Sequence, residues 1–249
     1  MNEIFAEFIG TFLLILLGNG VVANVVLRDT KGHQGGWIVI SLGWGLAVFV
    51  GVAVAGPVSG AHINPAVTLG LATSGMFAWA RVLPFILAQM AGALTGAFTV
   101  WLFYRRHFDR TEDPAAQLGC FSTIPAIRNI PSNFFSELIG TFVLIFVILY
   151  IAEPTVSTGG GEELKMGLGT LGALPVALLV TAIGLSLGGT TGYAINPARD
   201  LGPRIMHTLL PMKGKGSSDW PYAWIPVAGP LSGALLAAAF YLVHQMLFT

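Results

Sequence analysis

The tripeptide Asn-Pro-Ala occurs twice, at 64–66 and at 196–198, inside two segments of similar sequence. An asparagine just before a helix can cap its first N–H groups and still offer amide donors to another polar group. A proline at the first helical position loses no needed hydrogen bond and sets where the helix begins. Such side chains bind by hydrogen bonds and form no covalent intermediate, so the pattern predicts polar recognition. The two copies consist of Asn64, Pro65 and Ala66, and of Asn196, Pro197 and Ala198.

The rest of the chain is strongly apolar, so membrane helices must position these polar residues. Hydrophobic residues make up 54% of the 249 positions and charged residues 10%, with a mean hydropathy of +0.75. A soluble domain would carry about a quarter charged residues. The formal net charge is zero, which offers no electrostatic basis for binding nucleic acid. The lone Cys120 excludes an internal disulfide and most cysteine metal sites, and we expect no metal or cofactor.

Six apolar segments have the length of a bilayer-spanning helix, about 20 residues. The first lacks the basic region of a cleavable signal and is predicted to be retained. Each Asn-Pro-Ala begins a short apolar stretch, residues 65–76 and 197–209, which as a helix would reach about half-way across the hydrocarbon core. The predicted spans are Ile4–Val26, Trp37–Ala55, Val82–Phe103, Phe134–Ile151, Leu168–Leu187 and Ala223–Phe248.

The chain also repeats itself. Glu7–Phe12 returns as Glu137–Phe142, and glycine pairs spaced by four residues recur in the third and sixth spans. Three spans and a half-helix make an odd number of crossings, so the two repeats must lie upside down relative to each other. We therefore predict an all-α polytopic membrane protein with a single domain over residues 1–249. Its inverted repeats cover about 1–103 and 133–249, and a charged, proline-rich linker at about 104–132 lies outside the membrane.

The residues before each half-helix form irregular backbone at membrane depth. Such backbone is tolerated only where it is buried in protein or lines a water-filled cavity. Because the halves are inverted, the two half-helix N-termini would meet near the midplane, where each carries about half a positive charge. Cations and protons would be repelled there, while a neutral hydroxyl could donate and accept hydrogen bonds in passing. We predict that backbone carbonyls line this polar track at Gly60, Ala61, His62, Ile63, Gly192, Ala194 and Ile195.

Together these features resemble the aquaporin or major intrinsic protein family: two Asn-Pro-Ala boxes, six spans, paired Glu-x-x-Gly-Thr starts and Arg199 after the second box. The resemblance runs from Glu3 to about Tyr241. It implies six helices plus two re-entrant half-helices, one pore per protomer, and a homotetramer in the lipid bilayer. It also implies a multi-pass protein of the cell membrane, in bacteria the inner membrane, with both termini in the cytoplasm.

By the same resemblance, the narrowest ring of the pore comprises Trp44, Gly184, Tyr193 and Arg199. Water-selective members usually place histidine where Gly184 stands, so this ring has more room. Trp44 and Tyr193 can form an aromatic corner for carbon–hydrogen edges, and Arg199 offers donors to adjacent hydroxyls. The ring therefore resembles the glycerol facilitator branch and predicts a passive channel, not an enzyme. Its expected solutes are glycerol and related small uncharged molecules, with some water, and it should exclude ions and protons.

Three acidic residues are expected to support the pore without contacting the solute. Glu7 and Glu137 would brace the two re-entrant loops, and the resemblance implies that Asp200 orients the filter loop. His62 is expected to contribute its carbonyl and not to act as a ligand. Gly159–Gly161 suggests a flexible connection.

Two alternatives and one conflicting charge pattern remain open at this point. The protein could be a water-selective aquaporin, or a proton-coupled secondary transporter that uses Glu7 or Glu137 as a proton site, since inverted repeats also build transporters. The implied orientation places eight Lys and Arg residues of the connecting segments outside and only Arg81 and Lys165 inside. That distribution is the reverse of the positive-inside rule.

Overall fold

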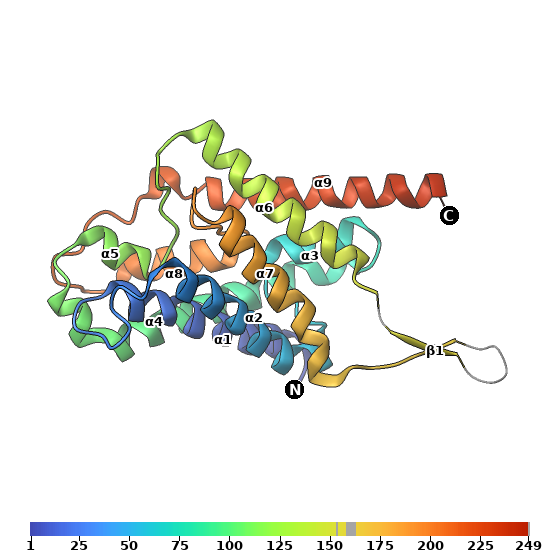
Figure 1. The fold of residues 1–249 in the computed structure, drawn as a ribbon, viewed down its shortest axis with the longest axis horizontal. Helices are drawn as coiled ribbons and strands as arrows, with labels where there is room; N and C mark the ends of the chain where they lie inside the picture. The colour runs from blue at the N-terminus through green and yellow to red at the C-terminus, as the bar shows by residue number, and fades with distance from the viewer. Residues whose placement is uncertain (153, 158–162, 249) are drawn as a thin grey trace.

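The computed structural model describes residues 1–152, 154–157 and 163–248, and its helices are arranged as Figure 1 shows. Over these residues, six helices are long and apolar enough to cross a membrane, and each overlaps one predicted span. The predicted flexible connection Gly159–Gly161 lies outside the described residues. The six helices are α1 Glu3–Val26, α2 Gly36–Ser59, α4 Val82–Arg110, α6 Ile130–Tyr150, α7 Leu174–Leu187 and α9 Ile225–Phe248.

Both predicted half-helices are present and begin at their prolines. α3 spans Pro65–Thr73 and α8 spans Pro197–Leu209. α3 ends three residues before the predicted position, because Gly75 adopts left-handed backbone at φ +77°. The N–H of Met76 then donates to the carbonyl of Leu71 at 2.9 Å, which closes the helix end in the usual glycine-dependent way.

The remaining elements are short. A two-stranded antiparallel hairpin projects from the end of the molecule at which α9 terminates, at the right of Figure 1. A turn of 3-10 helix precedes α7, so the first residues of the predicted fifth span are not α-helical. The short elements are η1 Trp79–Arg81, α5 Pro114–Gly119, β1 Thr155–Ser157, β2 Glu163–Lys165, η2 Gly169–Ala173 and η3 Trp220–Tyr222.

The predicted linker at 104–132 is partly helical, which corrects its expected boundaries. α4 continues two turns past Phe103 to Arg110, and α6 already begins at Ile130. The extension is polar, and the buried side chain of Gln117 donates to the carbonyls of Phe108 and Thr111, at 3.3 and 2.7 Å, where α4 ends. Hydropathy marks where a helix leaves the hydrocarbon, whereas capping bonds decide where it stops.

Helix packing follows the internal repeat. In the first half α1 packs on α2 and α4, in the second half α6 packs on α9 and α7, and the halves meet through α2–α7, α4–α8 and α3–α9. The repeated glycines lie at these crossings: any side chain at Gly92 or Gly96 would meet the backbone of α1, and at Gly229 or Gly233 that of α6. Small residues allow close helix approach where no hydrophobic force drives association.

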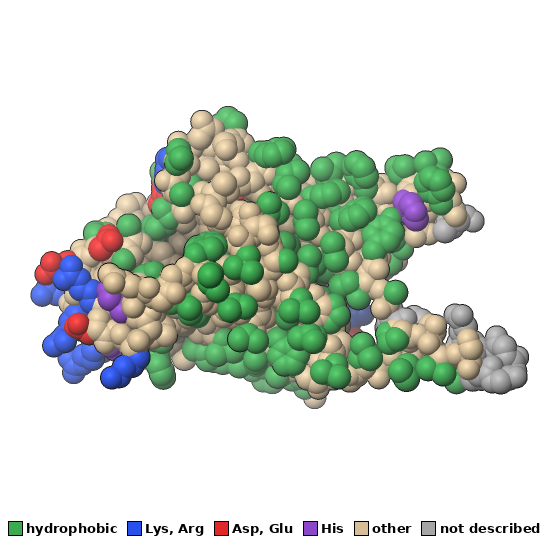
Figure 2. Space-filling model, in the orientation of Figure 1, with side chains coloured by type: hydrophobic (Ala, Val, Ile, Leu, Met, Phe, Trp, Pro, Cys, Tyr) green, Lys and Arg blue, Asp and Glu red, His purple; other side chains and the backbone are tan. Residues whose placement is uncertain are grey.

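Charged side chains gather at one end of the molecule, around the C-terminal end of α4 and α5, while the flanks are largely apolar (Figure 2). Three loops meet at this end. Arg110 pairs with Asp29 at 2.8 Å, Gln117 donates to the carbonyl of Lys213 at 3.0 Å, and Arg128 forms an ion pair with Asp219. These loops and the C-terminal end of α4 carry the eight basic residues counted from the sequence.

Candidate functional site

A cavity of about 150 Å³ lies between the two halves. Its lining combines aliphatic side chains of α2, α6 and α7 with the irregular backbone before α3 and α8. The predicted residues that line it are Trp44, Gly60, Ala61, His62, Ile63, Asn64, Tyr193, Ala194, Ile195, Asn196 and Arg199. Aliphatic lining residues include Val48, Val52, Leu144, Ile148, Val176 and Val180.

The two Asn-Pro-Ala segments meet face to face. The amide nitrogen of Asn64 donates to the carbonyl of Ile195 at 2.9 Å, and that of Asn196 donates to the carbonyl of Ile63 at 2.9 Å. Each amide oxygen caps its own helix, through Ala66 N at 2.8 Å and through Ala198 N at 3.0 Å. An amide nitrogen carries two hydrogens, so each asparagine retains one donor beside the cavity.

Glu7 braces the first re-entrant loop. It is fully buried, and four donors converge on its carboxylate. One oxygen accepts from Ser59 Oγ at 2.6 Å and from His62 N at 2.9 Å. The other accepts from Ile63 N at 2.7 Å and from Gln89 Nε2 at 2.8 Å. Charge-assisted bonds of this kind stabilise a buried carboxylate in a fixed position.

Glu137 holds the second loop in the same way, with fewer donors. It is also fully buried, and its two oxygens accept from Ala194 N at 3.0 Å and from Ile195 N at 2.9 Å. Both loops place isoleucine in left-handed backbone, at φ +44° for Ile63 and +43° for Ile195. That conformation is strained for a β-branched residue and needs support from its surroundings. The two carboxylates supply it.

The same bonds decide where the loop carbonyls point. In a planar trans peptide the N–H of one residue is opposite to the carbonyl of the residue before it. Because His62 N and Ile63 N face Glu7, the carbonyls of Ala61 and His62 point away from it. By the same geometry the carbonyls of Tyr193 and Ala194 point away from Glu137. The Tyr193 carbonyl is an addition to the predicted set.

The other predicted carbonyls belong to Ile63, Ile195, Gly60 and Gly192. Those of Ile63 and Ile195 each already accept one asparagine N–H, which leaves one lone pair. Gly60 lines the cavity, whereas Gly192 does not. A side chain at Gly192 would instead come against Thr123.

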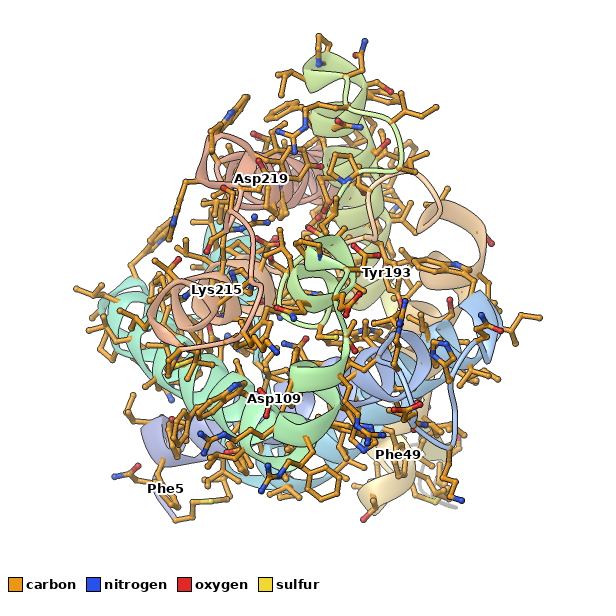
Figure 3. All side chains as sticks on the ribbon, turned by 90° about the vertical axis from the view of Figure 1, so that its left-hand side faces the viewer. Phe5, Phe49, Asp109, Tyr193, Lys215 and Asp219 are labelled. Atoms are coloured by element: carbon orange, nitrogen blue, oxygen red, sulfur yellow. The ribbon has the colours of Figure 1, made fainter. Side chains whose placement is uncertain are left out.

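Of the four residues predicted for the narrow ring, three lie together. Trp44 and Tyr193 are buried, and the guanidinium carbon of Arg199 lies 4.1 Å from the centre of the Trp44 ring. In Figure 3, which looks onto the charged end, Tyr193 lies inside the outline of the helices, whereas Phe5 lies at its rim. The aromatic corner and the donor group predicted from the sequence are therefore neighbours.

Gly184 lies behind this ring and does not line the cavity. A Cβ atom built on it would be 2.8 Å from both Cζ and Oη of Tyr193. The space that glycine leaves free on α7 is therefore occupied by the Tyr193 ring. Gly184 therefore makes room for the tyrosine, which can lie close against α7.

Asp200 orients the segment next to the ring and does not line the cavity. One of its oxygens accepts from Thr123 N at 2.7 Å and from Thr123 Oγ1 at 2.6 Å, and the other pairs with Arg204 at 2.8 Å. Arg204 is fully buried and also donates to the carbonyl of Thr123 at 3.1 Å. Two residues earlier, the carbonyl of Phe121 accepts from Arg199 at 3.4 Å.

Three residues that support the ring were not predicted from the sequence. The Trp44 ring lies over Gly18 of α1, where any side chain would collide with it. Asn19, also in α1 and buried, donates to the Phe121 carbonyl at 3.2 Å, so it shares that acceptor with Arg199. Trp37 of α2 donates its indole N–H to the Gly184 carbonyl at 2.9 Å. A buried asparagine inside an apolar span was the available signal for Asn19.

His62 and Cys120, the other residues considered from the sequence, are packed against neighbouring side chains or buried. The His62 ring packs against Phe77 and Phe85, with its Nδ1 3.1 Å from Thr68 Oγ1. Cys120 is fully buried outside the spans, and burial raises the pKa of its thiol. Among the described residues, no group of three or more His, Cys, Asp or Glu side chains could hold a metal ion.

Comparison with known proteins agrees with this geometry. The family described as Major intrinsic protein matches residues 1–241. The "Glycerol uptake facilitator protein" of Streptococcus pneumoniae is 54% identical over 241 residues, which covers 97% of this chain and 98% of that protein. A "Probable glycerol uptake facilitator protein" of Thermotoga maritima is 52% identical over 241 residues, which covers 97% and 98%.

A solved structure is similar over the same range. The crystal structure of the aquaglyceroporin from Plasmodium falciparum superposes with a TM-score of 0.80 at 35% identity, over 96% of this chain and 94% of that one. Six membrane-spanning helices, two half-helices that meet at paired Asn-Pro-Ala segments, and a match along nearly the whole sequence lead to one conclusion: the chain belongs to the major intrinsic protein family.

Proposed function

We propose that this protein is a passive membrane channel that facilitates diffusion of glycerol and related small uncharged solutes, with some water, and that excludes ions and protons. The observation that carries the proposal is the mixed lining of the cavity, which combines aliphatic side chains with the loop backbone, the asparagine amides and Arg199. A polyol combines the same two kinds of surface, carbon–hydrogen edges and hydroxyl groups. Relatives named glycerol uptake facilitators support this assignment.

Trp44, Tyr193 and Arg199 form the filter in this proposal, and Gly184 supports it from behind. The two aromatic rings receive the carbon backbone of the solute, while the guanidinium donates to adjacent hydroxyls. The Arg199 position is stabilised by the Trp44 ring at 4.1 Å and by the Phe121 carbonyl at 3.4 Å. A cation over an aromatic face within about 6 Å is attracted to it, so the ring keeps its shape between solutes.

Ion exclusion comes from the meeting point of the two half-helices. Each N-terminus contributes about half a positive charge, and the free N–H of each asparagine reinforces it. A cation would lose hydration there and would face two positive helix ends and two asparagine donors that cannot coordinate it. A neutral hydroxyl can donate to the loop carbonyls and accept from the asparagine amides in the same step.

The two alternatives receive less support. A water-selective channel would need a tighter ring than one in which tyrosine rests against glycine. A proton-coupled transporter would need Glu7 or Glu137 to exchange protons. Four donors converge on the Glu7 carboxylate and two backbone N–H groups on that of Glu137, so both are occupied in holding strained backbone.

The protein is a multi-pass membrane protein, and we further propose that it assembles as a homotetramer with both termini in the cytoplasm. Under this orientation the charged end in Figure 2 faces outward, together with its eight Lys and Arg residues. Passive flux does not depend on orientation. Protease cleavage within residues 111–129 of intact cells tests the orientation, and mass of the detergent-solubilised complex tests the tetramer.

Stopped-flow light scattering of vesicles containing the purified protein tests the function. A glycerol gradient should produce rapid shrinkage followed by reswelling that protein-free vesicles lack, and an internal pH dye should report no proton leak. Fast water flux without glycerol-dependent reswelling would support a water channel. Saturable uptake that collapses with the proton gradient would support a transporter. Either result would contradict the proposal.

A further inference from the structure

Trp37 contacts the filter from behind without lining the cavity. It lies in the first turn of α2, with 39% of its surface exposed. Its ring meets that of Tyr193 edge to face, with ring centres 5.8 Å apart and an interplanar angle of 78°. This geometry is the favoured arrangement for two aromatic rings, so the contact holds the tyrosine ring at a defined angle.

The indole N–H of Trp37 fixes the tryptophan in turn. It donates to the carbonyl of Gly184 at 2.9 Å, across 147 positions of sequence. α7 ends at Leu187, so this carbonyl lies in the last turn of the helix. The bond therefore ties the start of α2 to the end of α7.

Tyr193 is confined between Trp37 and the backbone of α7. A Cβ atom on Gly184 would lie 2.8 Å from Cζ of Tyr193, and a Cβ atom on Gly188 would lie 2.7 Å from Cζ2 of Trp37. The tyrosine backbone is in left-handed conformation at φ +38°, next to the residues held by Glu137. With its backbone fixed and its ring enclosed, Tyr193 can move away from the cavity only if Trp37 gives way.

We infer that Trp37 is a positioning residue of the filter: it holds the Tyr193 ring in place and so sets the largest polyol that passes. The inference rests on the proposed glycerol permeability. Removal of the indole lets the tyrosine ring tilt toward the vacated space at the protein surface. The filter then widens, and discrimination between glycerol and a longer polyol decreases.

The test is the ratio of xylitol to glycerol permeability in vesicles, which does not depend on how much channel each vesicle contains. In Trp37→Ala this ratio should rise about tenfold. That factor is the lower end of the discrimination that a closely fitting site achieves for a single methylene group. Trp37→Phe keeps an aromatic ring beside Tyr193 and should stay nearer to the wild-type ratio. Trp37→Leu also removes the indole and leaves part of its space free, so it should raise the ratio in the same direction and serves if the alanine variant does not fold.

Trp220 provides the matched control. It is 45% exposed, and its indole N–H donates to Thr208 Oγ1 at 3.1 Å. Trp220→Ala should leave the ratio unchanged. If Trp37→Ala and Trp37→Leu alter glycerol and xylitol permeability by the same factor, Trp37 is only structural and the inference fails. A wild-type protein without glycerol flux would instead contradict the proposed function itself.

Discussion

Substitution of Gly184 by alanine adds one methyl group directly behind the proposed filter. The new Cβ would lie 2.8 Å from Cζ and Oη of Tyr193, whereas ordinary van der Waals contact begins at 3.4 Å. The ring must therefore move by about 0.6 Å, and Trp37 blocks the outward direction. The remaining direction is into the cavity, toward Arg199. The substitution should narrow the filter without changing any group that contacts the solute.

The expected loss in Gly184→Ala follows from the cost of overpacking. Glycerol can pass the narrowed ring only if the tyrosine is pressed back against the new methyl group. Overpacking of one methyl group costs about 1–3 kcal/mol, and a barrier raised by that amount reduces permeability about 5- to 150-fold. Glycerol must fill the ring and should bear most of this cost. Water is smaller than the ring and should lose much less. Stopped-flow reswelling and shrinkage of the same vesicles measure both permeabilities.

Gly189 is the matched control for this substitution. It lies in the same segment, and a Cβ atom there would meet nothing within 4 Å. Gly189→Ala should conduct glycerol as the wild type does. Equal glycerol permeability in the two variants, or an equal loss of glycerol and water in Gly184→Ala, would refute the assignment of Tyr193 and Gly184. Adding Trp37→Ala to Gly184→Ala should restore glycerol flux, since the ring can then move outward.

Three further predictions concern the support of the site. Asp200→Asn leaves the buried Arg204 without its counter-charge, so the free energy of unfolding should fall by about 3–5 kcal/mol, measured as a lower melting temperature in detergent. The double variant Asp200→Asn, Arg204→Gln should recover part of this stability. A wild-type melting temperature for Asp200→Asn would contradict the pairing. Asn19→Leu removes the donor to the Phe121 carbonyl, so the free energy of unfolding should fall by about 1 kcal/mol and glycerol flux should decrease. Unchanged glycerol flux would show that the carbonyl shared with Arg199 is not needed for permeation. Cys120 should react with a maleimide only after denaturation, because the thiol is fully buried and its raised pKa disfavours the thiolate; rapid labelling of the folded protein would contradict its burial.

The helices were the most predictable part of the structure. All six spans and both half-helices lie where hydropathy, length and the Asn-Pro pairs predict them. The errors are at helix ends, such as the continuation of α4 to Arg110 and the early end of α3 at Thr73. Ends depend on capping by distant side chains such as Gln117 and on the backbone conformation of single glycines.

The site was predictable in its members and less so in its arrangement. Trp44, Tyr193 and Arg199 line the same cavity, as the family resemblance implies, and Arg199 lies against the Trp44 ring. The position of Gly184 behind Tyr193 and the contact of Trp37 with both were not visible in the sequence. Such contacts join residues of α2, α7 and the second loop, and no local pattern encodes how three separate segments pack.

Local sequence is enough to predict which segments cross the membrane, where the half-helices start and that the two halves are inverted. These properties follow from local hydropathy, proline and asparagine chemistry, and the parity of crossings. Tertiary structure alone decided that Asn64 and Asn196 each donate to the opposite loop, that buried carboxylates hold strained backbone, and that a glycine on α7 receives the Tyr193 ring. Width and shape at the filter depend on tenths of an ångström between segments more than a hundred residues apart, and only packing determines them.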